Sequence, residues 1–239
     1  MDNKVIIIGA TSGIGRELAI MYARNKWLVG ATGRRKELLQ SLQAEFPENI
    51  ITECFDVTEG ENIESIKNLT QQLGGLDLLI YNSGYGEPSK HLDWQIDERT
   101  TKINVNGFAE IVNYTFNYFV VEGKGHIAAT SSIASIRGSS FAPAYSASKA
   151  YMSTYMEGLY IKATKLKLPI YITDIQPGFV LTGMAKGEGQ FWVSSVEKAA
   201  HQIYGVISQK KRKAYITKRW WLVAKAMWLI PISIYKKIG

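Results

Sequence analysis

Residues 5–15 read Val-Ile-Ile-Ile-Gly-Ala-Thr-Ser-Gly-Ile-Gly, so a short apolar run leads directly into a glycine-rich segment. Four consecutive apolar residues that end at a glycine predict a buried strand. Gly9, Gly13 and Gly15 let the backbone turn sharply, and a helix that begins near Ile14 would present free N–H groups and the positive end of its dipole. This unit predicts a pyrophosphate site. A tight connection without a ligand is the alternative for such a turn taken alone.

Six further apolar runs alternate with segments of helical period. Together the runs predict strands at residues 5–8, 28–32, 50–55, 76–81, 127–130, 170–175 and 215–217. Strands that are apolar on both faces belong to a parallel sheet covered by helices on either side. We therefore expect an α/β fold with one doubly wound parallel sheet of about seven strands, and ligands bound beyond the carboxyl ends of the strands.

The size and composition of the chain favour one domain. Its 239 residues, 46% of them apolar, suffice to bury one core, and no repeat or linker divides them. We expect a catalytic domain over residues 1–218 and a distinct tail over 219–239. Cys54 is the single cysteine, which excludes an internal disulfide, and we expect a buried free thiol. The first strand follows Met1 too closely for a signal peptide, which favours a cytoplasmic location.

The net charge of +7 is unevenly distributed along the chain. Residues 198–239 hold 10 of the 28 Lys and Arg residues and no acid, which leaves 18 basic against 21 acidic residues before them. No basic patch interleaved with aromatic residues lies in the body of the chain, so we expect no nucleic-acid partner. His91, His126 and His201 lie far apart and lack the spacing of metal ligands, so we expect no metal site.

Tyr145 and Lys149 are candidates for acid-base chemistry. Carbonyl reduction needs a hydride donor, a proton donor for the developing alkoxide, and a group that holds the oxygen in line. Tyr145 is the candidate proton donor, and Lys149 lies one helical turn further on the same face. Because a phenol of pKa about 10 exchanges protons poorly near neutral pH, we expect the lysine ammonium to favour the phenolate. Ser132 is placed to hold the substrate oxygen, and Ser131 is the competing candidate.

The order and spacing of the glycine-rich turn, Ser132, Tyr145 and Lys149 resemble the short-chain dehydrogenase/reductase family over roughly residues 4–218. The family's register favours Ser132 over Ser131. The resemblance implies a Rossmann fold that commonly forms homodimers or homotetramers. It also implies that Asn104 holds a water which relays protons to Lys149, a role that Asn106 fits less well.

The end of the second predicted strand indicates the cofactor. Gly33, Arg34 and Arg35 stand there, with no acid at the place where an NAD enzyme usually binds the adenosine ribose. Gly33 leaves room, and Arg34 offers a charged fork suited to a 2′-phosphate, with Arg35 and Ser12 as helpers, which predicts NADP(H). The alternative is that both arginines only solvate a helix start.

The resemblance extends the cofactor site to several loops. By it, Asp56 and Val57 contact adenine, and Thr182 binds the carboxamide. Tyr81 and Ser83 depart from the family's usual residues. The predicted cofactor site comprises Gly9, Thr11, Ser12, Gly13, Ile14, Gly15, Arg34, Arg35, Asp56, Val57, Asn82, Ser83, Gly84, Tyr145, Lys149, Pro177, Gly178, Val180 and Thr182.

The tail is apolar and basic, with aromatic residues at both ends, but it is interrupted by Lys225 and Pro231. It falls short of the ~20 apolar residues of a membrane-spanning helix, while its composition suits an anchor at the membrane surface. Equally, Trp220, Trp221 and Trp228 would pack on the body or on a second subunit. The segment 181–194, which includes Met184, suits either a lid over an apolar substrate or a plain surface loop.

These features predict an NADP(H)-dependent oxidoreductase that interconverts a carbonyl and an alcohol, with a lipidic substrate if the tail binds membrane. Its expected catalytic residues are Asn104, Ser132, Tyr145 and Lys149. The alternative is a non-catalytic NADP(H)-binding sensor or membrane-associated scaffold.

Overall fold

The computed structural model describes residues 3–183 and 191–237 of the chain. Its centre is a seven-stranded parallel sheet in the order β3-β2-β1-β4-β5-β6-β7. The strands are β1 (Lys4–Ile8), β2 (Leu28–Gly33), β3 (Ile50–Cys54), β4 (Leu78–Tyr81), β5 (Gly125–Thr130), β6 (Ile170–Pro177) and β7 (Lys213–Ile216). All seven predicted strands are confirmed, and their ends differ from the predicted ones by no more than two residues.

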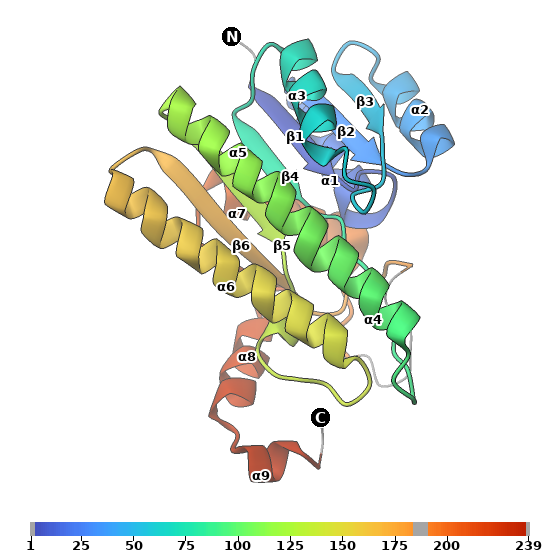
Figure 1. Cartoon of the computed structure of the whole chain (residues 1–239), viewed down its shortest axis with the longest axis vertical. Helices are drawn as coiled ribbons and strands as arrows, with labels where there is room; N and C mark the ends of the chain where they lie inside the picture. The colour runs from blue at the N-terminus through green and yellow to red at the C-terminus, as the bar shows by residue number, and fades with distance from the viewer. Residues whose placement is uncertain (1–2, 184–190, 238–239) are drawn as a thin grey trace.

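Helices cover both faces of the sheet (Figure 1). One face carries α1 (Gly13–Arg24), α2 (Lys36–Glu45) and α7 (Val196–Ser208). The other carries α3 (Asn62–Leu73), α5 (Phe108–Glu122) and α6 (Pro143–Leu166). Helix α4 (Trp94–Thr101) leads into α5 through a π-helical turn, η1 (Lys102–Gly107), and a 3-10 turn, η2 (Ile133–Ser135), follows β5. The predicted doubly wound α/β fold is therefore confirmed.

Strand β1 shows why the apolar runs form a covered sheet. Val5 and Ile7 belong to the core beneath α1, α2 and α7, whereas Ile6 and Ile8 belong to the core beneath α3, α5 and α6. Because both faces are buried, every residue of the strand is apolar rather than every second one. The direction of the strand order changes at β1, between β2 and β4, and in such sheets the ligand crevice lies at this point, beyond the carboxyl ends of the strands.

Cys54 does not lie where we expected it. The prediction of a buried thiol is wrong, because Cys54 is exposed as the last residue of β3, which forms one edge of the sheet. Its Sγ lies 3.7 Å from the carbonyl oxygen of Arg34. The apolar run around it gave no sign that β3 is an edge strand, since strand order follows from the topology of the whole chain.

The C-terminal segment forms α8 (Trp220–Leu229) and α9 (Ile232–Tyr235), which extend from one end of the molecule (Figure 1). Trp220 is buried against the body, whereas Trp221 and Trp228 are exposed. Arg137, in the loop after η2, donates from Nε to the Met227 carbonyl over 2.8 Å and from its guanidinium to the Ile230 carbonyl. In the described parts of the chain, no helix is both long and apolar enough to cross a membrane.

Candidate active site

The glycine-rich turn after β1 has a conformation that side chains would disrupt. Gly9 and Gly13 have φ values of 88° and 57°, in the left-handed region that favours glycine. A Cβ on Gly9 would lie 2.9 Å from the backbone of Ser83, and one on Gly15 would collide with the Gly9 carbonyl. The turn therefore packs backbone against backbone, and α1 starts at Gly13 with its free N–H groups at the crevice.

Asn82 joins this turn to the neighbouring strands. It follows β4, its Nδ2 lies 3.4 Å from the Gly9 carbonyl, and its Oδ1 accepts a 3.1 Å hydrogen bond from Thr130 Oγ1. Ser83 and Gly84 come next, partly buried, with the Ser83 backbone against Gly9. The structure thus brings the predicted residues after β1 and β4 together at the carboxyl edge of the sheet.

The two arginines after β2 have different partners. Arg35 donates from its Nε and Nη2 to Thr11 Oγ1 over 3.2 and 2.6 Å, and from Nη2 to Ser12 Oγ over 2.6 Å. Arg34 instead forms a 3.1 Å ion pair with Asp56. Arg35 is thus the arginine that lies on the glycine-rich turn, and the predicted order of importance at the 2′-phosphate, with Arg34 first and Arg35 as helper, stays a prediction.

The space beside Gly33 is occupied, contrary to the room we expected there. A Cβ on Gly33 would lie 2.5 Å from Thr11 Cγ2. An acidic side chain, as an NAD enzyme would place near the ribose, therefore has no space at this position unless Thr11 moves.

Asp56 and Val57 follow β3 and line the same edge. Partial burial raises the pKa of Asp56, but hydrogen bonds from Thr58 and Arg34 outweigh it and leave the pKa below its ordinary value. Val57 packs on Gly107, where a Cβ would lie 2.6 Å from the Val57 carbonyl oxygen. The glycine of the Asn-x-x-Gly element is thus needed for this packing.

Ser132 and Tyr145 lie together, whereas Ser131 faces away from the tyrosine. The hydroxyl of Ser132 is near enough to the Tyr145 phenol to lower its pKa, and Ser132 Oγ accepts from the Ala134 N–H over 3.1 Å. Ser131 Oγ donates to Asp174 Oδ1 and lies 3.1 Å from the Ile175 carbonyl. Of the two candidate serines, only Ser132 is therefore placed beside the phenol.

Burial raises the pKa of the Tyr145 phenol, and the hydrogen bond from Ser132 lowers it in part. The pKa of Tyr145 is therefore raised overall, whereas we expected a neighbouring ammonium to lower it. The reason is where Lys149 points: its Nζ donates to the Thr130 carbonyl over 2.9 Å and lies 5.8 Å from the centre of the Tyr145 ring. Burial lowers the pKa of Lys149 from 10.5 to about 8, although the charge of Asp174 acts in the other direction.

Asn104 lies fully buried in the π-helical turn η1. Its Oδ1 accepts from the Tyr85 N–H over 2.9 Å, and its Nδ2 donates to the Tyr85 carbonyl over 2.7 Å and to Ser148 Oγ over 2.9 Å. The side chain therefore fixes the loop after β4 to helix α6. Asn106, the competing candidate, is exposed.

Gly86 contacts the catalytic candidate Tyr145 and was missed by the sequence reasoning. A Cβ on Gly86 would lie 2.7 Å from Cγ of the Tyr145 ring and closer still to Cδ2. The loop after β4 thus packs its bare backbone on the face of the phenol. The glycines at 84 and 86 were the available signal, but only Gly84 matched the family's segment.

The segment after β6 lies between the glycine-rich turn and the tail. Gly178 donates to the Ile216 carbonyl over 2.6 Å, and a Cβ on it would collide with the indole of Trp220. Val180 is buried, and Thr182 Cγ2 would lie 3.4 Å from a Cβ on Gly13. Trp220 also packs on Phe179, Phe191 and Trp192. Of the segment predicted as lid or loop, Met184 lies outside the described residues.

Comparisons with known proteins show the family of the chain. A family model described as "short chain dehydrogenase" matches residues 3–191. An uncharacterized oxidoreductase of Myxococcus xanthus is 37% identical over 183 residues, which cover 73% of this chain and 71% of that protein. An uncharacterized oxidoreductase of Staphylococcus aureus is 30% identical over 187 residues, which cover 77% and 80% of the two proteins.

Two solved structures illustrate the likeness in fold. The structure described as ElxO with NADP bound aligns with a TM-score of 0.80 at 22% identity, over 90% of this chain and 97% of that one. A short-chain dehydrogenase from Streptomyces avermitilis aligns with a TM-score of 0.81, also at 22% identity, over 95% and 92% of the two chains.

Proposed function

Because this chain belongs to the short-chain dehydrogenase family, we propose that it is an oxidoreductase that interconverts a carbonyl and an alcohol with NADP(H) as its cofactor. The observation that carries the proposal is the placement of Ser132 beside the phenol of Tyr145, with Lys149 one helical turn away, at the carboxyl edge of the sheet. A proton donor and a group that orients the substrate oxygen thus lie beside a glycine-rich turn built for phosphate.

Each residue of this group has a distinct role in the proposal. Tyr145 donates its phenolic proton to the carbonyl oxygen during reduction and accepts it back during oxidation. Ser132 donates a hydrogen bond to the same oxygen and holds it near the phenol. Lys149 stabilises the phenolate left after proton transfer, because an ammonium favours the charged form of a neighbouring acid. Asn104 fixes the π-helical turn against α6, and we assign to it the water that relays protons to Lys149.

The residues at the crevice fit a bound nicotinamide dinucleotide, which supplies or accepts the hydride. Gly9, Gly13 and Gly15 leave the backbone bare for the pyrophosphate, and the N–H groups of the first turn of α1 point to it. In the proposal, Asp56 and Val57 contact the adenine. The nicotinamide half would contact the turn at Pro177 and Gly178, the residues Asn82 to Gly84 and the stretch Val180 to Thr182.

A preference for NADP(H) over NAD(H) is supported by the charges at the ribose end. Arg35 lies on the hydroxyls of Thr11 and Ser12, and a guanidinium in that place suits a 2′-phosphate. A side chain at Gly33 would meet Thr11, so the acid of an NAD enzyme would fit there only if Thr11 moved. A solved structure of similar fold is described as ElxO with NADP bound, which supports this assignment.

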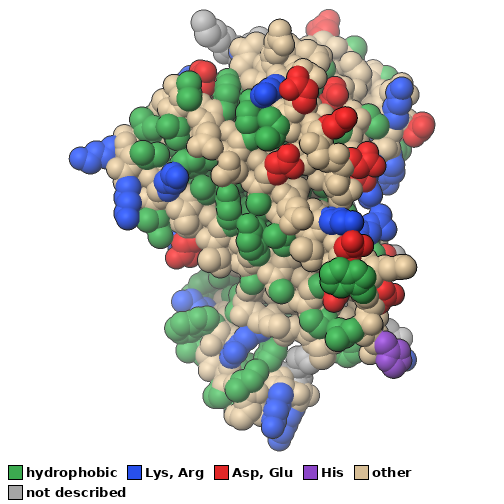
Figure 2. All heavy atoms as spheres, viewed as in Figure 1, with side chains coloured by type: hydrophobic (Ala, Val, Ile, Leu, Met, Phe, Trp, Pro, Cys, Tyr) green, Lys and Arg blue, Asp and Glu red, His purple; other side chains and the backbone are tan. Residues whose placement is uncertain are grey.

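The tail, which we define as residues 219–239, is proposed to contact a membrane surface. Trp221, Leu222, Trp228 and Leu229 of α8 are exposed, and the tail has no acidic residue. Figure 2 shows basic and hydrophobic side chains together at the end of the molecule that the tail forms. Aromatic and basic side chains of this kind suit the interface between lipid and water. A substrate that partitions into lipid then becomes the favoured carbonyl or alcohol.

The protein is further proposed to act in the cytoplasm, at the membrane surface, as a homodimer or homotetramer. Exposed apolar side chains on two neighbouring helices, Val121 of α5 and Tyr160 and Ile161 of α6, support self-association. Their burial against a second copy would remove apolar surface from water.

The test is NADPH oxidation by the purified full chain with ketones and aldehydes of increasing chain length, with and without lipid vesicles. We expect turnover that rises with chain length and falls at least about 100-fold in Tyr145→Phe, which removes the proton donor and keeps the ring. Unchanged turnover in Tyr145→Phe would refute the assignment. Tight NADPH binding by a wild-type protein that reduces none of the carbonyls would favour the sensor or scaffold instead.

A further inference from the structure

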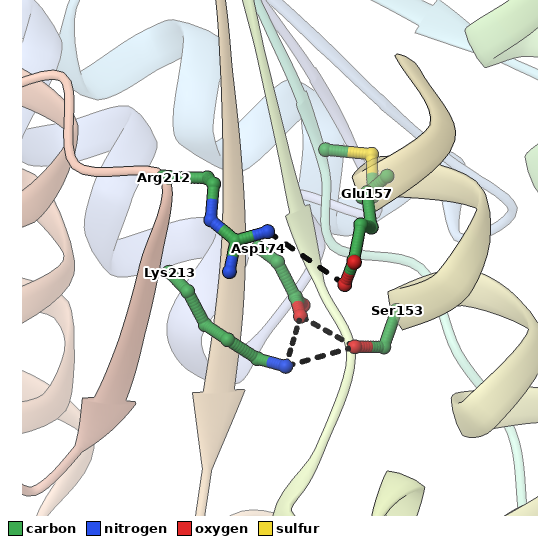
Figure 3. A pocket seen from close by; sticks show the side chains of 6 residues that line it. Ser153, Glu157, Asp174, Arg212 and Lys213 are labelled. Atoms are coloured by element: carbon green, nitrogen blue, oxygen red, sulfur yellow. Dashed lines mark hydrogen bonds and ion pairs between the residues drawn. The ribbon is translucent and has the colours of Figure 1, made fainter. Parts of the chain in front are cut away.

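Behind the site lies a buried carboxylate that the proposed chemistry does not use. Asp174 stands on β6 with 5% of its surface exposed. Its Oδ1 accepts from Ser131 Oγ, and its Oδ2 accepts from Ser153 Oγ over 2.7 Å and from Gln176 Nε2 over 3.0 Å. Lys213 Nζ lies 3.6 Å from the same Oδ2 (Figure 3). Both oxygens of the carboxylate are thus engaged, and the charge has one cationic partner.

The partners of Asp174 stand next to the residues that carry the chemistry. Ser131 immediately precedes Ser132. Ser153 lies one helical turn beyond Lys149 on α6, and Tyr145 lies one turn before that lysine, so the three share a side of the helix. Gln176, whose Nε2 is also 3.0 Å from Ser135 Oγ, immediately precedes the turn at Pro177 and Gly178. One carboxylate therefore ties the end of β5 to α6 and to the end of β6.

The cavity beside this cluster is too small for a ligand, so ligand binding does not explain why an acidic residue stands at position 174. The cavity drawn in Figure 3, lined by Ser153, Glu157, Asp174, Arg212, Lys213 and Met156, has a volume of about 10 Å³. Such a volume holds about one water molecule. Neither a substrate nor a cofactor fits there, so the function of Asp174 lies in its hydrogen bonds to the neighbouring side chains.

A carboxylate is the group that this arrangement requires. Three neutral donors and one ammonium converge on Asp174, and an acid is the side chain that accepts from all of them. A neutral amide could direct its NH2 group to Ser131, whose hydroxyl would then donate to the Ile175 carbonyl, but it would remove the negative charge that pairs with Lys213. Because a buried charge is stable only when it is paired and hydrogen-bonded, the cluster holds its members at fixed distances.

We propose that Asp174 is a positioning residue, which holds Ser132 through Ser131 and holds helix α6 through Ser153, and so keeps Tyr145 and Lys149 aligned with Ser132. The inference rests on the function proposed above for those three residues. It adds a residue that touches neither the phenol nor the reacting atoms. Asp174 also contributes a fixed negative charge near Lys149, and this charge keeps the ammonium form of the lysine more stable than burial alone allows.

The charged and titratable groups around Asp174 come from two elements. Helix α6 contributes Lys149 and Glu157, and the segment of β7 contributes Arg212, Lys213 and Tyr215. Arg212 and Glu157 pair with each other over 3.6 Å at the surface. Burial and then the charge of Asp174 raise the pKa of Tyr215, so the phenol stays neutral through the neutral range. Lys149 is therefore the group whose titration reports on Asp174.

The test compares Asp174→Asn with Glu157→Gln, which removes an acid from the same cavity wall without touching the cluster. In Asp174→Asn we expect kcat for carbonyl reduction to fall about 10- to 100-fold, the effect of a small misplacement of reacting groups, with the KM for NADPH little changed. Glu157→Gln should keep both constants. In the cofactor-free protein, NMR titration of the Lys149 side chain should give a lower pKa in Asp174→Asn than in the wild type.

Two milder variants keep the inference testable if Asp174→Asn does not fold. Ser131→Ala and Ser153→Ala each remove one hydrogen bond to the carboxylate and should each lower kcat by about 5-fold, in keeping with the loss of one such bond. Wild-type kcat in Asp174→Asn, or in both serine variants, would overturn the inference. If the wild-type enzyme reduces no carbonyl, the proposed function fails, and the NMR titration decides separately: an unchanged Lys149 pKa in Asp174→Asn overturns the positioning role.

Discussion

The aromatic ring of Tyr145 rests on the bare backbone of Gly86, at a distance that leaves no room for a methyl group. The loop after β4 and the helix α6 thus meet at Tyr145, the proposed proton donor. Because the proposed reaction needs the phenol in line with Ser132, we expect the position of this loop to set the geometry of proton transfer.

Gly86→Ala is therefore expected to impair catalysis more than folding. The added methyl group must push Tyr145 or the loop aside, and we expect kcat to fall about 10- to 100-fold. The matched control is Gly158→Ala, on the same helix as Tyr145, where a Cβ would meet nothing within 4 Å. That variant should keep its activity and melt at the same or a higher temperature, since alanine favours helix over glycine. Equal activity of the two variants would contradict the role of Gly86.

Arg35→Ala should change the choice of cofactor more than Arg34→Ala does. Arg35 lies on Thr11 and Ser12, whereas the charge of Arg34 is already shared with Asp56. Loss of a charged hydrogen bond to the 2′-phosphate should raise the KM for NADPH about 10- to 100-fold and leave the KM for NADH nearly constant. Steady-state kinetics with both cofactors measure the difference. A larger loss in Arg34→Ala would restore the order of importance that the sequence alone indicated.

Lys149→Met should stabilise the protein at neutral pH while it abolishes activity. The folded-state pKa of Lys149 is about 8, below the ordinary 10.5, so at pH 7 the fold carries the cost of a buried ammonium. That cost is roughly 3 kcal/mol at most, and it fades as the pH rises from 8 toward 10.5, because the unfolded chain then binds more protons than the folded one. The free energy of unfolding of the variant should exceed that of the wild type at pH 7.

The free energies of unfolding of Lys149→Met and the wild type should also be compared at pH 10, where the cost of the buried ammonium is mostly lost. We expect the two unfolding curves to converge there, and we expect Lys165→Met, an exposed lysine at the end of α6, to match the wild type at both values. A wild type that is more stable than Lys149→Met at pH 7 would show that the hydrogen bond to the Thr130 carbonyl outweighs the burial of charge.

The membrane proposal is tested by substitutions rather than by removal of the tail, because Trp220 packs on Gly178 beside the site. The double variant Trp221→Ser and Trp228→Ser alters two exposed side chains only. It should lose cosedimentation with vesicles that contain phosphatidylglycerol, and wild-type binding should weaken with added salt. Trp94→Ser, which alters an exposed tryptophan on α4, is the matched control. Equal sedimentation of all three proteins would end the membrane proposal.

The fold was predictable because strands such as Val5 to Ile8 must be apolar on both faces, and that requirement is visible along the chain. The order of the strands within the sheet was not visible along the chain. For this reason the exposed position of Cys54 on the edge strand β3 was not predicted. The residue types of the site were also predictable from the spacing of Ser132, Tyr145 and Lys149. The contacts of Gly86 and Asp174 were not predictable, since only the folded chain brings these residues to Tyr145 and Ser131. Arg35 was predicted as a helper at the cofactor, but its contact with Thr11 was not.

The packing of Trp220 on Gly178 has a consequence for how this sequence can diverge. No side chain fits at residue 178 while an indole occupies the space above it. In descendants of this chain, a larger residue at 178 becomes acceptable only after residue 220 has become smaller, and that first step opens a cavity. The reverse order produces a steric clash first. The two positions should therefore covary among close homologues, and a C-terminal segment exchanged from a distant relative should bring its own partner for residue 178.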